Sequence, residues 1–139
     1  MTVALDLARC IKSIRYEDLP KEAVTWAKVA IADTLGAALA GAKEPCTEFV
    51  ERIVVADRVC EGPCLVFGGS ARMRALDAAL INGTAAHALD YDDTSKTMSG
   101  HPSAVIVPAI LALGEQAGAS GRKIIEAYVA GFETGTGIG

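Results

Sequence analysis

Residues 73–94 read MRALDAALINGTAAHALDYDDT, and they decide the fold because they join an alanine-rich helical pattern to a dense polar cluster. The first part, 73–89, places small apolar residues at helical spacing, which predicts a helix that other helices approach closely. The second part holds Asp90, Asp92 and Asp93, and both histidines of the chain, His87 and His101, lie nearby. Packing alone does not require such a concentration of polar groups, so the stretch predicts a functional site at a helix end.

The composition of the whole chain favours helices. The chain has 139 residues and is 51% hydrophobic, yet it holds only three Phe, three Tyr and one Trp, so most of its apolar side chains are small or aliphatic. Such side chains suit closely packed helices better than the strands of a β-sandwich. We therefore predict an all-α fold with one core, a multi-helix bundle with at most one short strand.

The apolar periodicity predicts six helices and one extended segment. The helices span residues 2–14, 21–42, 45–58, 73–89, 102–117 and 120–132, and the extended segment spans 64–67. Asp18 is expected to cap the second helix, and Pro108 is expected to kink the fifth helix or mark its start. The alternating Gly135, Gly137 and Gly139 predict a weakened helical pattern at the end of the chain.

The helix at 21–42 is apolar on nearly every side after Trp26, which predicts that it is buried all round. Gly36 and Gly41 would let another backbone approach it closely. We expect no membrane span, because Lys28 and Asp33 interrupt this helix and the other apolar runs are too short.

Charge and cysteine content limit the function further. The net charge is −4 and the pI is about 5.1, which argues against a nucleic-acid partner. No signal peptide is recognised, so a cytoplasmic location is expected. The four cysteines, Cys10, Cys46, Cys60 and Cys64, lack zinc-ligand spacing and are interpreted as reduced structural thiols. The alternative is a redox pair formed by Cys60 and Cys64.

The mean hydropathy of +0.32 is high for a free-standing domain. This value predicts that much of the surface is buried against a partner chain, or that the sequence is a piece of a larger protein.

Three chemistries compete for the acidic cluster. Asp90, Asp92 and Asp93 have the oxygen ligands that Mg²⁺ prefers, but their spacing does not put them on one helix face. An aspartyl nucleophile would need a preceding strand, whereas a helix is expected there. Acid–base chemistry by crowded carboxylates and a nearby histidine is the third possibility. Structural roles also remain open, with the aspartates capping a helix and His87 packed in the core.

The stretch 78–94 and the segment Gly100-His101-Pro102-Ser103 closely resemble the MmgE/PrpD family, also called the 2-methylcitrate dehydratase family. The segments 32–41 and 127–133 resemble an early and a later helix of the same family. The resemblance implies a large all-helical domain and a smaller α/β lid, usually in homodimers, without a metal or other cofactor. Residues 1–139 would form the N-terminal portion of the helical domain without the lid, and the isolated chain is expected to be inactive.

The resemblance also implies roles for individual residues. It matches His101 and Asp90 to catalytic positions and Thr94 to a substrate-binding position. We add Lys96 and His87 as substrate-binding residues, with Lys96 and Arg72 as the nearest cations. The implied substrates are small di- or tricarboxylic acids, and a dehydratase that eliminates water is the predicted activity. Decarboxylation, epimerisation and a non-catalytic helical module are the alternatives.

Overall fold

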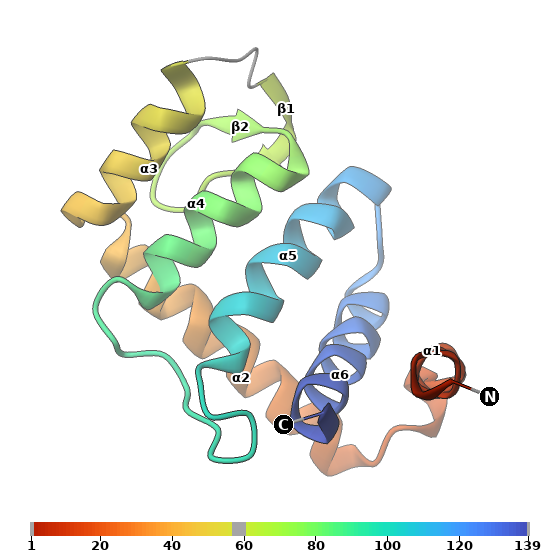
Figure 1. The fold of residues 1–139 in the computed structure, drawn as a ribbon. Coiled ribbons are helices and arrows are strands. Elements are labelled where there is room, and N and C mark those ends of the chain that lie inside the picture. Colours follow the sequence, from red (N-terminus) through yellow and green to blue (C-terminus); the bar gives the residue numbers. More distant parts are fainter. Residues whose placement is uncertain (1, 57–60, 139) are drawn as a thin grey trace.

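The computed structural model describes residues 2–56 and 61–138, which form a mostly helical fold (Figure 1). The six α-helices are α1 (Val3–Ser13), α2 (Lys21–Gly41), α3 (Pro45–Ala56), α4 (Ala75–His87), α5 (Pro102–Ala117) and α6 (Gly121–Ile138). A 3₁₀ turn, Tyr16–Asp18, precedes α2, and two short strands, β1 (Glu61–Leu65) and β2 (Arg72–Met73), lie before α4. The predicted helical fold class is confirmed.

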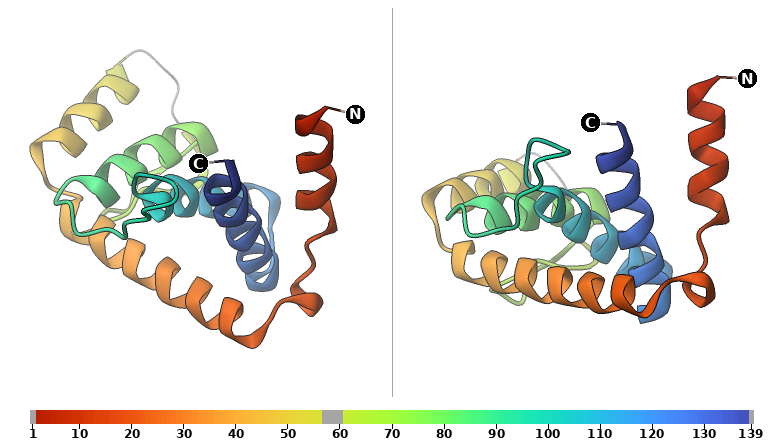
Figure 2. Two further views of the ribbon diagram at one scale, coloured as in Figure 1. Left: turned by 60° about the horizontal axis from the view of Figure 1, so that its bottom comes forward. Right: turned by 90° about the horizontal axis from the view of Figure 1, so that it is seen from below.

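Helix α4 is the centre of the arrangement. It packs against α2, α3 and α5, and the two strands lie beside its N-terminal half. Helix α2 runs beneath α4 and α5, whereas α6 packs beside α5 and α1 stands at the edge against α6 (Figure 2). A small cluster of buried alanines joins α2, α4 and α5: Ala38, Ala85, Ala86 and Ala104. These side chains are short enough for the three backbones to come close together.

Glycine makes the closest of these approaches possible. A Cβ atom added to Gly41 of α2 would lie 2.1 Å from the carbonyl oxygen of Ala85 in α4. A Cβ atom added to Gly83 of α4 would lie 3.3 Å from the carbonyl oxygen of Ala104 in α5. The predicted close approach is confirmed at Gly41, whereas Gly36 has open space around it in the described structure.

At most one short strand was expected, whereas the described structure has two, β1 and β2. Residues Arg72–Met73 pair antiparallel with β1, because the extended segment needs a partner for its backbone hydrogen-bonding groups. The buried side chain of Asn82 then ties the following backbone to α4. Its oxygen accepts a hydrogen bond from the Phe67 N–H at 2.8 Å, and its Nδ2 donates to the Leu65 carbonyl at 2.9 Å.

Several helix boundaries differ from those expected. Helix α6 continues past 132 to Ile138, and the small Gly135 there lets the side chain of Met98, from the loop before α5, lie against the helix. Asp18 lies in the 3₁₀ turn and does not cap α2, whose N-cap is Pro20 without a side-chain hydrogen bond. Helix α5 begins at Pro102, as predicted, and runs on through Pro108.

The prediction that α2 is buried on nearly every side is wrong for the described structure. Trp26, Val29 and Leu39 of α2 are exposed. Within the described residues, α2 is also the one helix long and apolar enough to cross a bilayer by length and composition. Core helices of water-soluble proteins meet the same criteria, and α2 packs here against α4, α5 and α6.

The described cysteines are free thiols. Cys64 is buried and donates a hydrogen bond from Sγ to the Ala112 carbonyl at 3.0 Å, whereas Cys10 and Cys46 are exposed. Burial raises the pKa of the Cys64 thiol, which keeps it protonated and unreactive at neutral pH. Cys60 lies outside the described residues, so the alternative of a redox pair is not addressed.

Two glycine substitutions in the same helix test the close packing of α2 against α4. We expect Gly41→Ala to lower the free energy of unfolding by about 1–3 kcal/mol, because the new methyl group meets backbone that cannot move aside cheaply. Gly36→Ala is the matched control and should raise the free energy by about 0.5–1 kcal/mol through helix propensity. Denaturant unfolding measures both, and equal effects would contradict the packing described here.

Alkylation of the native protein tests the environment of the thiols. With iodoacetamide at neutral pH, we expect Cys10 and Cys46 to be modified and Cys64 to stay intact, because the Cys64 thiol is buried and protonated. Peptide mass spectrometry identifies each site, and unfolding in denaturant should make Cys64 reactive. Rapid labelling of Cys64 in the folded protein would show that the buried cluster around it does not shield the thiol.

Candidate functional site

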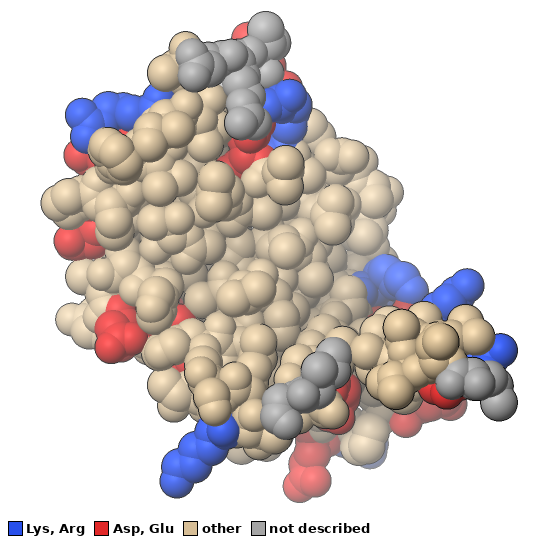
Figure 3. Space-filling model, in the orientation of Figure 1, with Lys and Arg blue, Asp and Glu red and all other residues tan. Residues whose placement is uncertain are grey.

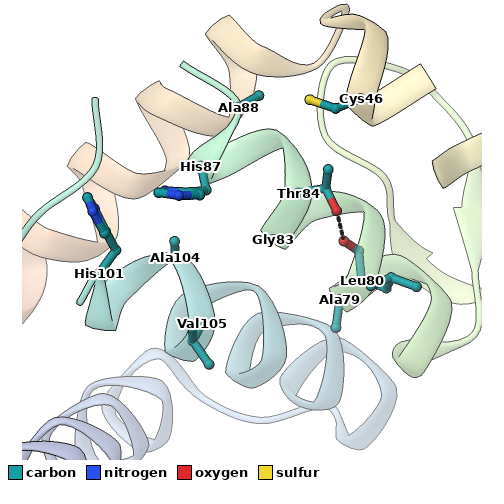
Figure 4. Close-up of a pocket in the computed structure, with 10 residues that line it drawn as sticks. All are labelled: Cys46, Ala79, Leu80, Gly83, Thr84, His87, Ala88, His101, Ala104 and Val105. Carbon is teal, nitrogen blue, oxygen red and sulfur yellow. Dashed lines mark hydrogen bonds between the residues drawn. The ribbon is translucent and has the colours of Figure 1, made fainter. Parts of the chain in front are cut away.

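The two histidines lie together where α4 ends and α5 begins. His87 is the last residue of α4, and His101 directly precedes α5. Their ring centroids are 4.5 Å apart and the rings are tilted by 59°. Figure 4 shows both imidazoles at one end of a groove between the two helices. His87 has a half-exposed side chain, so the interpretation as a packed core histidine is wrong.

The buried carboxylate of Asp92 lies close to both imidazoles. Its side chain is fully buried, and Nδ1 of His87 lies 3.0 and 3.1 Å from its two oxygens. An ionised carboxylate can only accept, so Nδ1 of His87 must carry the proton and Nε2 is left facing outward in the neutral ring. Nδ1 of His101 is 3.3 Å from Asp92 Oδ2 but makes no hydrogen bond.

Asp90 approaches His101 from the solvent side. Its Oδ1 atom lies 3.5 Å from Nε2 of His101, and 77% of its side chain is exposed. The backbone of Asp90 adopts a φ of +57°, a left-handed conformation that aspartate tolerates better than most residues. This turn directs the chain back toward α5, so that Asp90 and Asp92 lie against opposite nitrogens of the His101 ring.

Asp93 faces away from the histidines. Its Oδ1 atom accepts a hydrogen bond from the backbone N–H of Ser103 at 3.0 Å, and its Oδ2 atom accepts from the Ser103 hydroxyl at 2.6 Å. Ser103 is the second residue of α5, so Asp93 satisfies a backbone donor at the start of that helix. The expectation of a capping aspartate therefore holds for Asp93 and not for Asp92.

Thr94 and Lys96 occupy the exposed part of the loop between Asp93 and His101. Ser95 and Gly100 pair through two backbone hydrogen bonds, which close residues 96–99 into a tight turn. Among the described residues, neither side chain makes a hydrogen bond or ion pair. Arg72 lies elsewhere, in β2, where it pairs with Glu115 near the far end of α5, so its expected place near the site is wrong.

The groove beside the histidines is about 760 Å³ in volume and mostly apolar. Helix α4 supplies Leu80, Gly83 and Thr84 to its wall, and α5 supplies Ala104 and Val105. Figure 3 shows that the face over α4 and α5 carries little charge, because Lys, Arg, Asp and Glu gather around its edges. The groove therefore offers polar groups mainly at its histidine end.

The described residues include one cluster with potential metal ligands. His87, Asp90, Asp92 and His101 each offer one ligand atom, and these atoms lie within 4.8 Å of one another. The three-aspartate arrangement considered for Mg²⁺ is not formed, because Asp93 is turned toward Ser103. A metal held by the cluster would also have to replace the hydrogen bond between His87 and Asp92. The geometry thus fits acid–base chemistry more directly than metal binding.

The sequence located most of this cluster but missed the role of one residue. His101, Asp90 and His87 are brought together as neighbours, but the buried group between the rings is Asp92. The sequence analysis offered metal binding, acid–base chemistry among crowded carboxylates and helix capping for Asp92, and it did not predict a position between two histidines. The five-residue separation of Asp92 from His87 is the only local signal for their contact. It predicts that contact only when α4 is known to end at His87.

The sequence of the chain is similar to that of one known protein family. The model of the MmgE/PrpD N-terminal domain matches residues 5–139. The chain is 28% identical to the cis-aconitate decarboxylase-like protein oryM of Aspergillus oryzae, with 99% of this chain and 30% of that protein aligned. It is also 28% identical to cis-aconitate decarboxylase of Aspergillus terreus, with 99% and 29% aligned. The chain thus spans about three tenths of the length of these relatives.

Removal of the buried carboxylate tests how the histidine pair is held. We expect Asp92→Ala to reduce the free energy of unfolding by about 1.5–3 kcal/mol, the range for a hydrogen bond to a charged group. We also expect His87 to lose its Nδ1–H tautomer, as measured by ¹⁵N NMR of the imidazoles. Asp90→Asn is the control, since Asn tolerates the left-handed backbone and should leave the His87 tautomer unchanged. Retention of the Nδ1–H tautomer in Asp92→Ala would refute this arrangement.

Proposed function

Because the chain belongs to the MmgE/PrpD family, we propose that it contributes acid–base residues to a lyase acting on small di- or tricarboxylic acids. The observation that carries the proposal is the pair His87 and His101, whose rings flank the buried carboxylate of Asp92. A histidine held by a carboxylate can give and take a proton near neutral pH.

We assign the central proton transfer to His101. Its Nε2 atom lies 3.5 Å from Oδ1 of Asp90, whose side chain is 77% exposed, so this nitrogen is on the side of the ring that is turned toward solvent. Asp92 lies at the opposite side of the ring, with Oδ2 3.3 Å from Nδ1 of His101, where its negative charge stabilises positive charge that develops on the imidazole in the transition state. His87 presents Nε2 beside it as a second hydrogen-bonding group for the substrate, and Thr94 is proposed to bind a substrate hydroxyl or carboxylate.

Decarboxylation is the reaction that we favour, because the relatives that align over 99% of the chain are named for it. In this step the bond between carbon and a carboxylate breaks, and CO₂ leaves. The electron pair of the broken bond is delocalised into the neighbouring double bond of the acid. A proton from the His101 imidazolium then neutralises the resulting carbanion. Dehydration, which the family resemblance suggested first, needs the same proton donor at a departing hydroxyl. It remains an alternative outcome of the test below.

Substrate carboxylates also need cations. Among the described residues, no Lys or Arg pairs with Asp90, Asp92 or Asp93, and Lys96 is the cation on the loop itself. Like charges repel, so the aspartates cannot bind a polyanion alone. We propose that Lys96 acts together with cations from other parts of the whole enzyme. This chain aligns with about 30% of the length of the oryM protein.

The reaction is tested by proton NMR in D₂O. The protein, expressed from its complete reading frame, is incubated separately with cis-aconitate, citrate, 2-methylcitrate and iminodisuccinate. We expect cis-aconitate to lose CO₂ and yield a product with deuterium at the protonated carbon. A new alkene from citrate or 2-methylcitrate would instead establish dehydration. Failure of the folded protein to convert any of the four acids would refute the proposed substrate class.

The role of His101 is tested on the acid that reacts. We expect His101→Ala to lower kcat by about 10²–10⁴-fold, the usual contribution of a general acid or base. Gln116→Ala, at the exposed far end of α5, is the control for changes in that helix and should keep full activity. Full turnover by His101→Ala would assign the proton transfer to another residue.

A further inference from the structure

Asp93 connects the histidine loop to the interior of the protein. Besides its two hydrogen bonds from Ser103, it is linked through the Ser103 hydroxyl to Tyr128, whose phenol oxygen lies 2.8 Å from Ser103 Oγ. Ser103 is fully buried and Tyr128 is 5% exposed. These three side chains come from the loop, from α5 and from α6, so one short chain of hydrogen bonds crosses three elements.

The direction of this chain follows from its chemistry. An ionised Asp93 can only accept, so Ser103 must use its one hydroxyl proton to donate to Asp93. The Tyr128 hydroxyl must therefore donate to Ser103 Oγ. Burial raises the pKa of the Tyr128 phenol, and the charge of Asp93 raises this pKa further, although the hydrogen bond with Ser103 lowers it. The net rise keeps the phenol protonated at neutral pH, as the donor role requires.

The hydrogen-bonded set of Asp93, Ser103 and Tyr128, here called the anchor, lies next to the residues of the site in the sequence. Asp93 follows Asp92 directly, and Ser103 follows His101 by two residues. The hydrogen bonds between Asp93 and Ser103 thus fix the backbone on both sides of the contact between Asp92 and His101. Without them, Asp92 would be held by the hydrogen bond to His87, whose side chain is itself 53% exposed.

We propose that Asp93 is a positioning residue, supported by Ser103 and Tyr128, that holds Asp92 at the fixed position between His87 and His101. This inference rests on the proposed acid–base function of the histidines. Small displacements of groups that transfer protons cost a large share of the rate, so the anchor should influence turnover without touching the substrate. A role confined to helix capping would stabilise α5 and leave the histidines as they are.

The test compares variants that remove single atoms of the anchor. Tyr128→Phe removes only the donor hydroxyl, and Ser103→Ala removes the link while its backbone N–H still bonds to Asp93. Tyr16→Phe is the matched control, because it makes the same chemical change beside Arg122, away from the loop. Each variant of the protein, expressed from its complete reading frame, is measured for melting temperature, for kcat and KM, and for the ¹⁵N signature of the His87 tautomer.

We expect Ser103→Ala to lower kcat by about tenfold to a hundredfold with little change in KM, since misplacement of catalytic groups acts on the chemical step. Tyr128→Phe should lower kcat by a smaller factor in the same direction, and Tyr16→Phe should match the parent protein. The ¹⁵N spectrum of Ser103→Ala should show a weakened Nδ1–H tautomer of His87 at temperatures where the variant remains folded.

A lower melting temperature with unchanged kcat and an unchanged His87 tautomer would overturn the proposal and leave Asp93 as a helix cap. Should Ser103→Ala fail to fold, Asp93→Asn decides between these outcomes, because its amide oxygen can still accept from the Ser103 N–H while the carboxylate oxygen that accepts from the Ser103 hydroxyl is replaced by an amide nitrogen. If the parent protein converts none of the acids tested, the proposed function fails. The tautomer measurement then still shows separately whether the anchor holds the histidine pair.

Discussion

The site depends on the close contact between the backbones of α4 and its two neighbours. Gly41 allows α2 to lie against the Ala85 carbonyl, and Gly83 allows α4 to approach the Ala104 carbonyl of α5. Side chains of ordinary size at these points would separate the helices. Because α4 and α5 pack so closely, the last residue of one and the residue before the other meet, and the two imidazoles lie 4.5 Å apart.

The loop between these helices gives three neighbouring carboxylates different environments. Asp90 adopts a left-handed backbone and stays in solvent, Asp92 is buried between two imidazoles, and Asp93 bonds to the start of α5. Asp93 is directed away from the other two, whereas carboxylate oxygens of Asp90 and Asp92 lie within 4.8 Å of one another around the His101 ring. The same residue type thus provides an exposed group beside His101, a buried partner for His87 and a hydrogen-bond acceptor at the start of α5.

The groove beside this loop has a mostly apolar wall. Leu80 on α4 and Val105 on α5 line it as exposed apolar side chains, and charges lie mainly at the periphery of this face. These residues contribute to the mean hydropathy of +0.32. The polar groups at the histidine end are consequently the ones able to fix the orientation of a bound molecule in the groove.

The sequence by itself determined the helices and the location of the polar cluster. Apolar spacing placed α4 and α5, Pro102 marked the start of α5, and the alanine-rich composition indicated close helix packing, since these signals act between residues near in sequence. Tertiary structure alone decided that Asp92 contacts both histidines, that Asp93 reaches Ser103 and Tyr128, and that Arg72 pairs with Glu115. The second strand and the continuation of α6 past Phe132 also depend on contacts with distant segments. Such contacts form only when the helices have packed, so no local pattern of residues encodes them.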